Sequence, residues 1–561
     1  MRLLTSVGLS AAISLGAAAQ AQAPAPVTAG AMCADPAGAA AAPTLGPIKV
    51  VEGFGTGGFK ADTESAEAQR LFDHGMRLAF AFNWPEAKRA FQAAQAADPS
   101  CATCVWGEAY AVGPTLNYGV GEAEIRDGAR LARRAAGLAG DASPIQRGLI
   151  EAMRTRYAGH PVKDRQKQDE AYADALGELA AAHPASDDVA ILAADAALIA
   201  DASWYDDKPR ELSGRGERAR VLLERVLARN PGHTQAIHLY IHLTEWSDDP
   251  FRALAHADRL GALAPASSHL VHMPSHTYYR VGRYADAAAV NLKAVRIDQA
   301  YAAEVGPPGG FGKLPLVGHN IHFGIGGAVM SGDEATAREL ASVMDQTYPS
   351  AERTGFRAFA GASTYFVHAR FDTAEEARAL ADPGKKQPLA RALWRYARGE
   401  AFARAGDSAA LKAELDALTA VQKAQAGKGG FGAPEPIVEI ARLTLTGRAA
   451  ALRGDWPAAV GAFDRAAEVQ REKKVLHGDP PGWWFPVRRS LGVALLMDGK
   501  AERARWELRR SLTDTPDDPL TLYALSQTAA KLGRDRDAEA ALASAKAGWR
   551  GDEIAFTLAA I

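Results

Sequence analysis

Histidines are concentrated in one part of this 561-residue chain. Of the fourteen histidines, nine fall in the stretch 233–322, where an even spread would place about two. They are His233, His238, His242, His256, His269, His272, His276, His319 and His322. Three sets have the i, i+3, i+4 or i+7 spacings that place side chains on one face of an α-helix. These sets are His238 and His242, then His269, His272 and His276, then His319 and His322.

The residues around these three sets are apolar, which predicts burial. Ile237 and Leu239 flank His238, and Val271 and Met273 flank His272. Buried imidazoles must share hydrogen bonds or bind a species that accepts their lone pairs. We therefore predict a convergent pocket lined by His238, His242, His269, His272, His276, His319 and His322. The alternative is that the histidines only complete the packing, and we expect this of His233, in a Pro-Gly turn, and of His256.

A pocket rich in imidazole favours a transition metal ion. Nitrogen ligands suit copper, zinc, nickel or iron, whereas a shortage of inward-facing carboxylates disfavours magnesium and calcium. Seven histidines exceed the three or four ligands of one zinc ion. A copper site, mononuclear or dinuclear, and a zinc site with additional histidines around it both fit this number.

Candidate catalytic groups near the histidines are few. Glu245 lies three residues after His242 and is the nearby carboxylate in phase with that set, so it is a candidate general base. Tyr240, Tyr278 and Tyr279 are candidate proton donors, with packing or hydrogen bonding as the alternative for each. The chain has no Gly-x-Ser-x-Gly, His-Glu-x-x-His or Walker motif, and Val105 after Cys104 excludes a haem-type C-x-x-C-H.

The elements that position these residues follow a repeated frame. Gly75 is followed at offsets of 12, 16, 19 and 24 by Ala87, Phe91, Ala94 and Pro99. The same frame gives Ala459, Phe463 and Ala466 after Gly447, and Ala504, Leu508, Ser511 and Pro516 after Gly492. Small residues let paired helices approach closely, the large apolar residue fills the groove, and Pro ends the second helix. In the central repeat Ala287 and Ala294 keep the frame, but Asn291 takes the large apolar position.

These positions resemble the tetratricopeptide repeat (TPR), which implies an all-α solenoid of antiparallel helix pairs. Three segments are similar to those of a group of bacterial TPR proteins. They are Cys-Ala-Thr-Cys-Val-Trp-Gly at 101–107, His-Leu-Val-His-Met-Pro-Ser-His at 269–276 and Gly-His-Asn-Ile-His-Phe at 318–323. The resemblance covers most of residues 65–550 and implies a shared central pocket, but it brings no established activity.

Cys101 and Cys104 form a C-x-x-C pair that suggests a local disulfide, half of a metal site, a redox motif or free thiols. We expect the pair at the start of a helix after Pro99, without a role as ligands of the central site. A disulfide here closes too short a loop to add much stability. Cys33 is assigned no role.

The N-terminus predicts export. Arg2, an apolar stretch and the Ala21-x-Ala23 pattern are typical of a cleavable secretory signal, which predicts a periplasmic or secreted protein. No later segment is apolar enough to span a membrane, and a net charge of −2 gives no electrostatic case for nucleic acid. We predict five regions: a signal peptide (1–23), an Ala/Pro/Gly-rich linker of low order (24–60), N-terminal repeats (61–230), central histidine-rich repeats (231–345) and C-terminal repeats (346–561).

Two functions fit these observations. In the first, the central hairpins hold a transition metal for redox or hydrolytic chemistry or for metal handling. In the second, the chain is a scaffold whose concave surface binds a protein or a peptide, and the histidines serve packing. Metal content separates the two.

Overall fold

The computed structural model describes residues 47–117, 119–159, 163, 165–201, 204, 211–307, 309–425, 435–479, 481–553 and 561. Helices dominate these ranges and no β-strand occurs in them, which confirms the predicted all-α class. None of their helices combines the length and the apolar character that a membrane span requires. The predicted signal peptide and residues 24–46 of the predicted linker lie outside the described residues.

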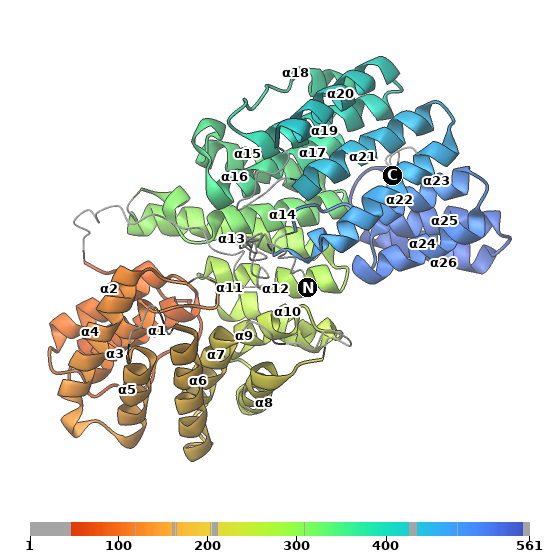
Figure 1. Ribbon diagram of the computed structural model, residues 1–561. Helices are drawn as coiled ribbons and strands as arrows, with labels where there is room; N and C mark the ends of the chain where they lie inside the picture. The colour runs from red at the N-terminus through yellow and green to blue at the C-terminus, as the bar shows by residue number, and fades with distance from the viewer. Residues whose placement is uncertain are drawn as a thin grey trace, which may run out of the picture.

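The N-terminal helices form the first hairpins of the solenoid (Figure 1). They are α1 (Ala66–Phe80), α2 (Trp84–Ala97), α3 (Ala102–Ala111), α4 (Glu122–Leu138), the 3₁₀ helix η2 (Ala139–Asp141), α5 (Pro144–Arg156), α6 (Arg165–Ala182), α7 (Asp187–Ala200) and α8 (Gly214–Arg229).

The central helices carry the histidines and lie between the other two regions in Figure 1. They are α9 (Thr234–Thr244), η3 (Pro250–Ala253), α10 (Leu254–Leu263), α11 (Ser268–His272), α12 (Pro274–Arg280), α13 (Tyr284–Val305), η4 (Phe311–Lys313), α14 (Val317–Ser331) and α15 (Glu334–Thr347).

The C-terminal helices complete the array. They are η5 (Ser350–Glu352), α16 (Gly355–Ala362), α17 (Thr364–Phe371), α18 (Ala374–Ala379), α19 (Pro388–Arg404), α20 (Ser408–Gln425), α21 (Glu435–Leu452), α22 (Trp456–Glu472), η6 (Val475–His477), α23 (Val487–Met497), α24 (Ala501–Asp514), α25 (Pro519–Lys531) and α26 (Asp535–Gly548).

Close approach at the repeat glycines explains the helix pairs. A Cβ atom at Gly75 would lie 2.7 Å from Cε1 of Phe91, and a Cβ atom at Gly447 would lie 2.6 Å from Cζ of Phe463. The Phe91 ring also reaches Gly107 of the next hairpin, where a Cβ would lie 2.5 Å away. One large side chain therefore packs against glycines of two hairpins, as the TPR frame predicts.

The array curves so that distant segments reach the central helices (Figure 1). The Tyr284 hydroxyl of α13 donates to the carbonyl of Pro516 (2.9 Å), and the backbone N–H of Arg550 donates to the carbonyl of Ser331 on α14 (2.8 Å). A Cβ at Gly326 would lie 2.4 Å from the Trp484 ring. The loop before α23 therefore lies against α14, in the middle of the chain.

The described part of the predicted linker, residues 47–60, also packs on the array. Phe54 is buried against Tyr301, with the ring centroids 5.8 Å apart. The carbonyl of Gly53 accepts a hydrogen bond from Ala266 N–H (2.9 Å). This part of the segment departs from the low order expected of a linker, because its aromatic residues find apolar contacts that a composition rich in Ala, Pro and Gly does not reveal.

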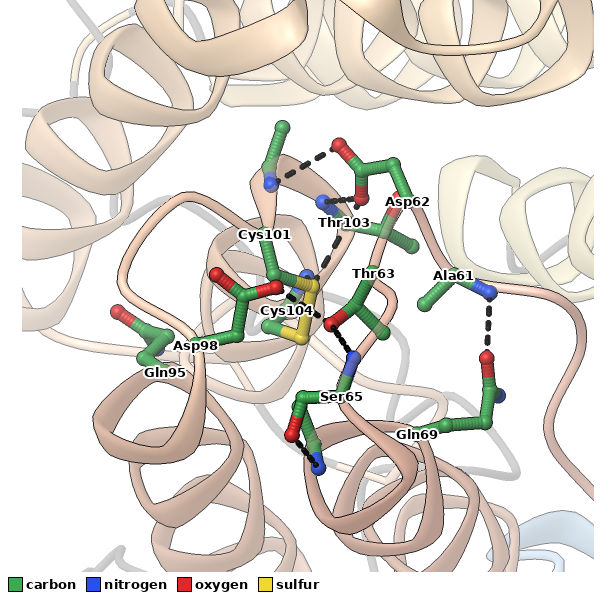
Figure 2. The surroundings of a disulfide bond; sticks show 12 residues. Ala61, Asp62, Thr63, Ser65, Gln69, Gln95, Asp98, Cys101, Thr103 and Cys104 are labelled. Carbon is green, nitrogen blue, oxygen red and sulfur yellow. Dashed lines mark hydrogen bonds between the residues drawn. A yellow bond between two sulfur atoms is a disulfide. The ribbon is translucent and has the colours of Figure 1, made fainter.

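Figure 2 shows Cys101 and Cys104 joined in a disulfide at the start of α3, the position predicted for the pair. The Asp62 carboxylate accepts hydrogen bonds from the N–H groups of Ala102 (3.0 Å) and Thr103 (2.8 Å). These bonds satisfy two of the free donors at the helix N-terminus. The disulfide takes no part in the histidine cluster.

Candidate metal centre

Six of the seven predicted histidines come together in two adjacent groups. The first group is His238, His242 and His269, and the second is His272, His276 and His319. Within each group the candidate ligand nitrogens all lie within 4.8 Å of one another, and every member is buried. The spacing predicted that at least three imidazole nitrogens converge, and the structure brings three together at each of two neighbouring points. A third candidate set, His242, Glu245, His276 and Asp479, takes one histidine from each group.

The second group has the shortest contacts between nitrogens. His272 Nε2 lies 2.8 Å from His276 Nε2 and 3.0 Å from His319 Nε2. Two nitrogens bound to one ion at about 2.0–2.1 Å are about 2.8–3.4 Å apart for bond angles of about 90–109°. The observed separations are those of N–H···N hydrogen bonds between imidazoles, and they also fit ligands around a shared ion.

Hydrogen-bond acceptors hold the opposite ring nitrogen, Nδ1, of His272 and of His276. His272 Nδ1 lies 2.6 Å from Asn291 Oδ1, and the Asn291 amide nitrogen donates to the carbonyl of Ala287 (2.8 Å). Because Asn291 Oδ1 must then accept, His272 carries its proton on Nδ1. The Nε2 lone pair of His272 consequently points at His276 and His319.

Two buried carboxylates hold His276 in the same way. His276 Nδ1 lies 2.8 Å from Glu245 Oε2 and 3.3 Å from Asp479 Oδ1. The other Glu245 oxygen, Oε1, lies 3.3 Å from His242 Nδ1. One carboxylate therefore orients a histidine of each group. A metal-binding histidine commonly donates its second ring N–H to such a carboxylate or carbonyl.

Electrostatics keep most of these imidazoles neutral. Burial lowers the pKa of His238, His269, His272 and His319 well below the usual range, and neighbouring histidines lower it further. His276 differs: burial alone would lower its pKa, but the charges of Asp479 and Glu245 outweigh burial and raise the pKa to about 10. A proton and a metal ion therefore compete for the Nε2 atom of His276.

The pKa values of the two carboxylates, Glu245 and Asp479, shift in opposite directions. Burial alone would raise the pKa of Glu245, but His276 and His242 outweigh it and hold the pKa below its usual range. Burial and the charge of Glu245 together raise the pKa of Asp479. Glu245 is therefore the ionised partner of the histidines. With both oxygens facing imidazole N–H groups, it orients ligands, and this geometry does not favour the role of a free general base.

The other residues singled out from the sequence lie apart from the two groups. His322 packs on Phe359 and Trp484, with ring centroids 5.3 and 5.6 Å away, because three residues along α14 turn it about 60° from His319. Burial lowers the pKa of His322 to about 3.

The candidate proton donors are engaged elsewhere. The Tyr240 hydroxyl donates to Glu224 (2.8 Å) and the Tyr278 hydroxyl donates to Asp258 (2.8 Å). The Tyr279 hydroxyl donates to the backbone carbonyl of Phe323.

His233 and His256, expected to be incidental, belong to neither group. His233 Nδ1 lies 3.3 Å from the Thr56 hydroxyl. His256 Nδ1 accepts from Arg259 (2.8 Å).

Asp479 and Asn291 are the site residues that sequence reasoning missed. Asp479 lies in the segment His-Gly-Asp-Pro-Pro-Gly-Trp-Trp at 477–484, about 200 residues from the histidines, and no helical period marks it. Asn291 did leave a signal, because it interrupts the apolar position of the repeat frame. A polar residue at a packed position needs a partner, and His272 is that partner.

No family model and no curated protein matches the chain. Solved structures that resemble it are helical repeat proteins. A human IFIT1 dimer with PPP-AAAA is 12% identical, with 79% of this chain and 90% of that chain covered and a TM-score of 0.32. The Cut9–Hcn1 hetero-tetramer of APC/C is 14% identical, with 88% of this chain and 90% of that chain covered and a TM-score of 0.28. Yeast Tom70 is 9% identical, with 84% of this chain and 90% of that chain covered and a TM-score of 0.27. At these values the likeness carries no argument about function.

Proposed function

We propose that this chain is an exported TPR-like metalloprotein whose central hairpins bind a transition metal ion through His272, His276 and His319. One observation carries the proposal: His272 Nε2 meets two other Nε2 atoms at 2.8 and 3.0 Å while its own proton is fixed on Nδ1. That lone pair can accept one N–H group from His276 or His319, and a metal ion between the three nitrogens would account for both contacts at once.

The surroundings support a metal ion more than packing alone. Three imidazoles leave at least one coordination position open, which is the arrangement of catalytic rather than closed structural sites. Redox or hydrolytic chemistry is therefore the class of reaction that suits the site. The ions that fit imidazole ligands are copper, zinc and iron.

Metal analysis of the full chain, purified without a histidine tag, tests this proposal. We expect about one or more transition metal ions per chain after dialysis. The double variant His242→Ala with His276→Ala removes one histidine from each group, so it should retain less than about a tenth of the metal.

A matched control removes two histidines outside the groups, His183→Ala with His256→Ala, and should keep the metal content of the parent. Circular dichroism of both variants should show the helicity of the parent. Equal metal content in the parent and the His242→Ala, His276→Ala variant would instead favour the peptide- or protein-binding scaffold.

Export is the second part of the proposal. It is supported by Arg2, the apolar stretch and the Ala21-x-Ala23 pattern, and by the resemblance to bacterial TPR proteins. Mass spectrometry of the protein recovered from the periplasm or medium should find a chain that begins near Pro24. A recovered chain that retains residues 1–20 would contradict cleavage.

A further inference from the structure

The first histidine group, His238, His242 and His269, is built on the same plan as the second. In each group, two histidines four residues apart are joined by one histidine from a later helix. His238 and His242 of α9 are joined by His269 of α11. In the second group, His272 and His276 are joined by His319 of α14. The two groups therefore repeat one arrangement along the solenoid.

Contacts at Nδ1 also orient two histidines of the first group, His238 and His242. His238 Nδ1 lies 3.0 Å from the carbonyl of Phe80, which can only accept, so the Nε2 lone pair of His238 faces His269 Nε2 at 3.0 Å. Glu245 holds His242 Nδ1. Among the described residues the buried His242 Nε2 has no hydrogen-bond partner, and a buried acceptor without a partner is unfavourable.

Each group is covered by one phenylalanine that contacts all three of its rings. Phe82 lies 4.4 Å from His238, 6.1 Å from His242 and 4.9 Å from His269, between ring centroids. Phe323 lies 5.1, 4.7 and 4.7 Å from the three rings of the second group. The two phenylalanines come from different parts of the chain, the turn after α1 and helix α14.

The backbone of Phe82 is strained in order to hold this position. Its φ of 56° is a left-handed conformation that is rare for an aromatic residue. Strain of this kind persists where the surroundings fix it, and it clusters at functional sites. Glycine would relieve the strain in this turn, but it would remove the ring that covers the histidines.

We propose that His238, His242 and His269 bind a second metal ion, so that the two groups hold a pair of copper ions side by side. This inference rests on the proposed function of the second group. The groups are adjacent: the rings of His242 and His276 lie 5.2 Å apart, and those of His269 and His272 lie 5.7 Å apart. Glu245 contacts one histidine of each group.

The local charge favours monovalent copper for the pair. Glu245 and Asp479 are the acidic residues whose carboxylates contact the six histidines among the described residues, and both are buried. Two carboxylates can offset at most two positive charges, which is the charge that two Cu(I) ions with neutral imidazoles bring. Two divalent ions would leave an excess of at least two positive charges in a buried site, which is unfavourable. Imidazole ligands also suit copper.

Copper stoichiometry tests the second site. The metal-free full chain is loaded anaerobically with Cu(I) and freed of weakly bound ions with a chelator. We expect about two copper ions per chain in the parent. His238→Ala with His269→Ala should retain about one, and so should His272→Ala with His319→Ala, because each variant destroys one group. The control His183→Ala with His256→Ala should retain about two.

The outcomes separate the two proposals. One copper per chain in the parent, lost only in the His272→Ala, His319→Ala variant, overturns the second site and leaves the proposed function standing. A parent that binds no metal overturns both. Two zinc ions per chain, retained in the presence of Cu(I), overturn the assignment to copper.

X-ray absorption of the copper-loaded parent needs no variant and therefore does not depend on how the variants fold. A copper–copper scattering path of about 3.5–4 Å is expected for the pair. Spectra with nitrogen scattering alone, at full copper loading, would overturn the adjacency of the two ions.

Discussion

Two hairpins built on the same repeat frame use one position in different ways. In α21 and α22, Gly447 is followed sixteen residues later by Phe463, whose ring fills the space against the glycine. In the central hairpin of α12 and α13, Ser275 and Asn291 hold the corresponding positions. There Asn291 accepts a hydrogen bond from His272 Nδ1 at 2.6 Å.

The difference between Phe463 and Asn291 shows how one position of the repeat can serve either packing or a functional site. The frame needs volume at this position, and a polar residue is tolerated inside it only when another group satisfies its hydrogen bonds. In the regular hairpin the position supplies stability. In the central hairpin Asn291 holds the same position and fixes the proton of His272 on Nδ1. The polar residue at an apolar position of the repeat therefore indicates where the histidine site lies.

The largest expected effect removes the packing residue of the regular hairpin. Phe463→Ala should lower the free energy of unfolding by about 3–5 kcal/mol, because the cavity between paired helices cannot close fully. Chemical denaturation followed by circular dichroism measures this. Trp506→Ala, at a side chain that is 53% exposed, is the control and should change stability little. Phe463→Ala should keep the metal content of the parent. Loss of metal would show that the regular hairpin also supports the histidine site.

The next effect concerns the carboxylate that both histidine groups share. Glu245→Gln leaves one oxygen and one NH₂ group where two imidazole N–H groups need acceptors, so one histidine loses its orientation. Affinity for the metal should fall by about 10–100-fold. Competition with a chromophoric chelator measures it. Glu224→Gln, whose carboxylate accepts from Tyr240, is the matched control. Equal affinity in parent and Glu245→Gln would show that the carboxylate does not orient the ligands.

Restoring the regular frame in the central hairpin should have a smaller effect. Asn291→Leu supplies apolar volume but removes the acceptor for His272 Nδ1, so affinity should fall by about 10-fold, with stability close to that of the parent. Asn291→Asp keeps an acceptor oxygen and should keep most of the affinity. If Asn291→Leu and Asn291→Asp bind the metal equally, the contrast between the two hairpins is one of packing alone.

The smallest effect is expected at the other position of the frame. The Ser275 hydroxyl lies 3.4 Å from His272 Nδ1, a long contact compared with that of Asn291. Ser275→Ala should therefore change metal affinity by less than about threefold. The same chelator competition measures this change. A loss as large as that of Asn291→Leu would mean that the hydroxyl, and not the amide, fixes the proton of His272.

Helices and histidine faces were predictable because both depend on local spacing. Gly75 and Phe91 are sixteen residues apart and face each other within one hairpin. The same separation brings Gly447 and Phe463 together. His238 and His242 share a helical face for the same reason. Spacing alone is not sufficient, as His322 shows. It lies three residues after His319, which is compatible with a shared face, but its ring packs against Trp484 and lies outside both groups.

The sequence by itself determined an all-α repeat array with three buried histidine faces, since hydrophobic period and side-chain spacing act within one or two helices. Only the tertiary structure decided that six histidines divide into two groups, that Asp479 joins His276 and that Phe82 covers His238. His276 and Asp479 are about 200 residues apart. Their contact depends on the curvature of the array over many hairpins. No local pattern in the sequence predicts that curvature.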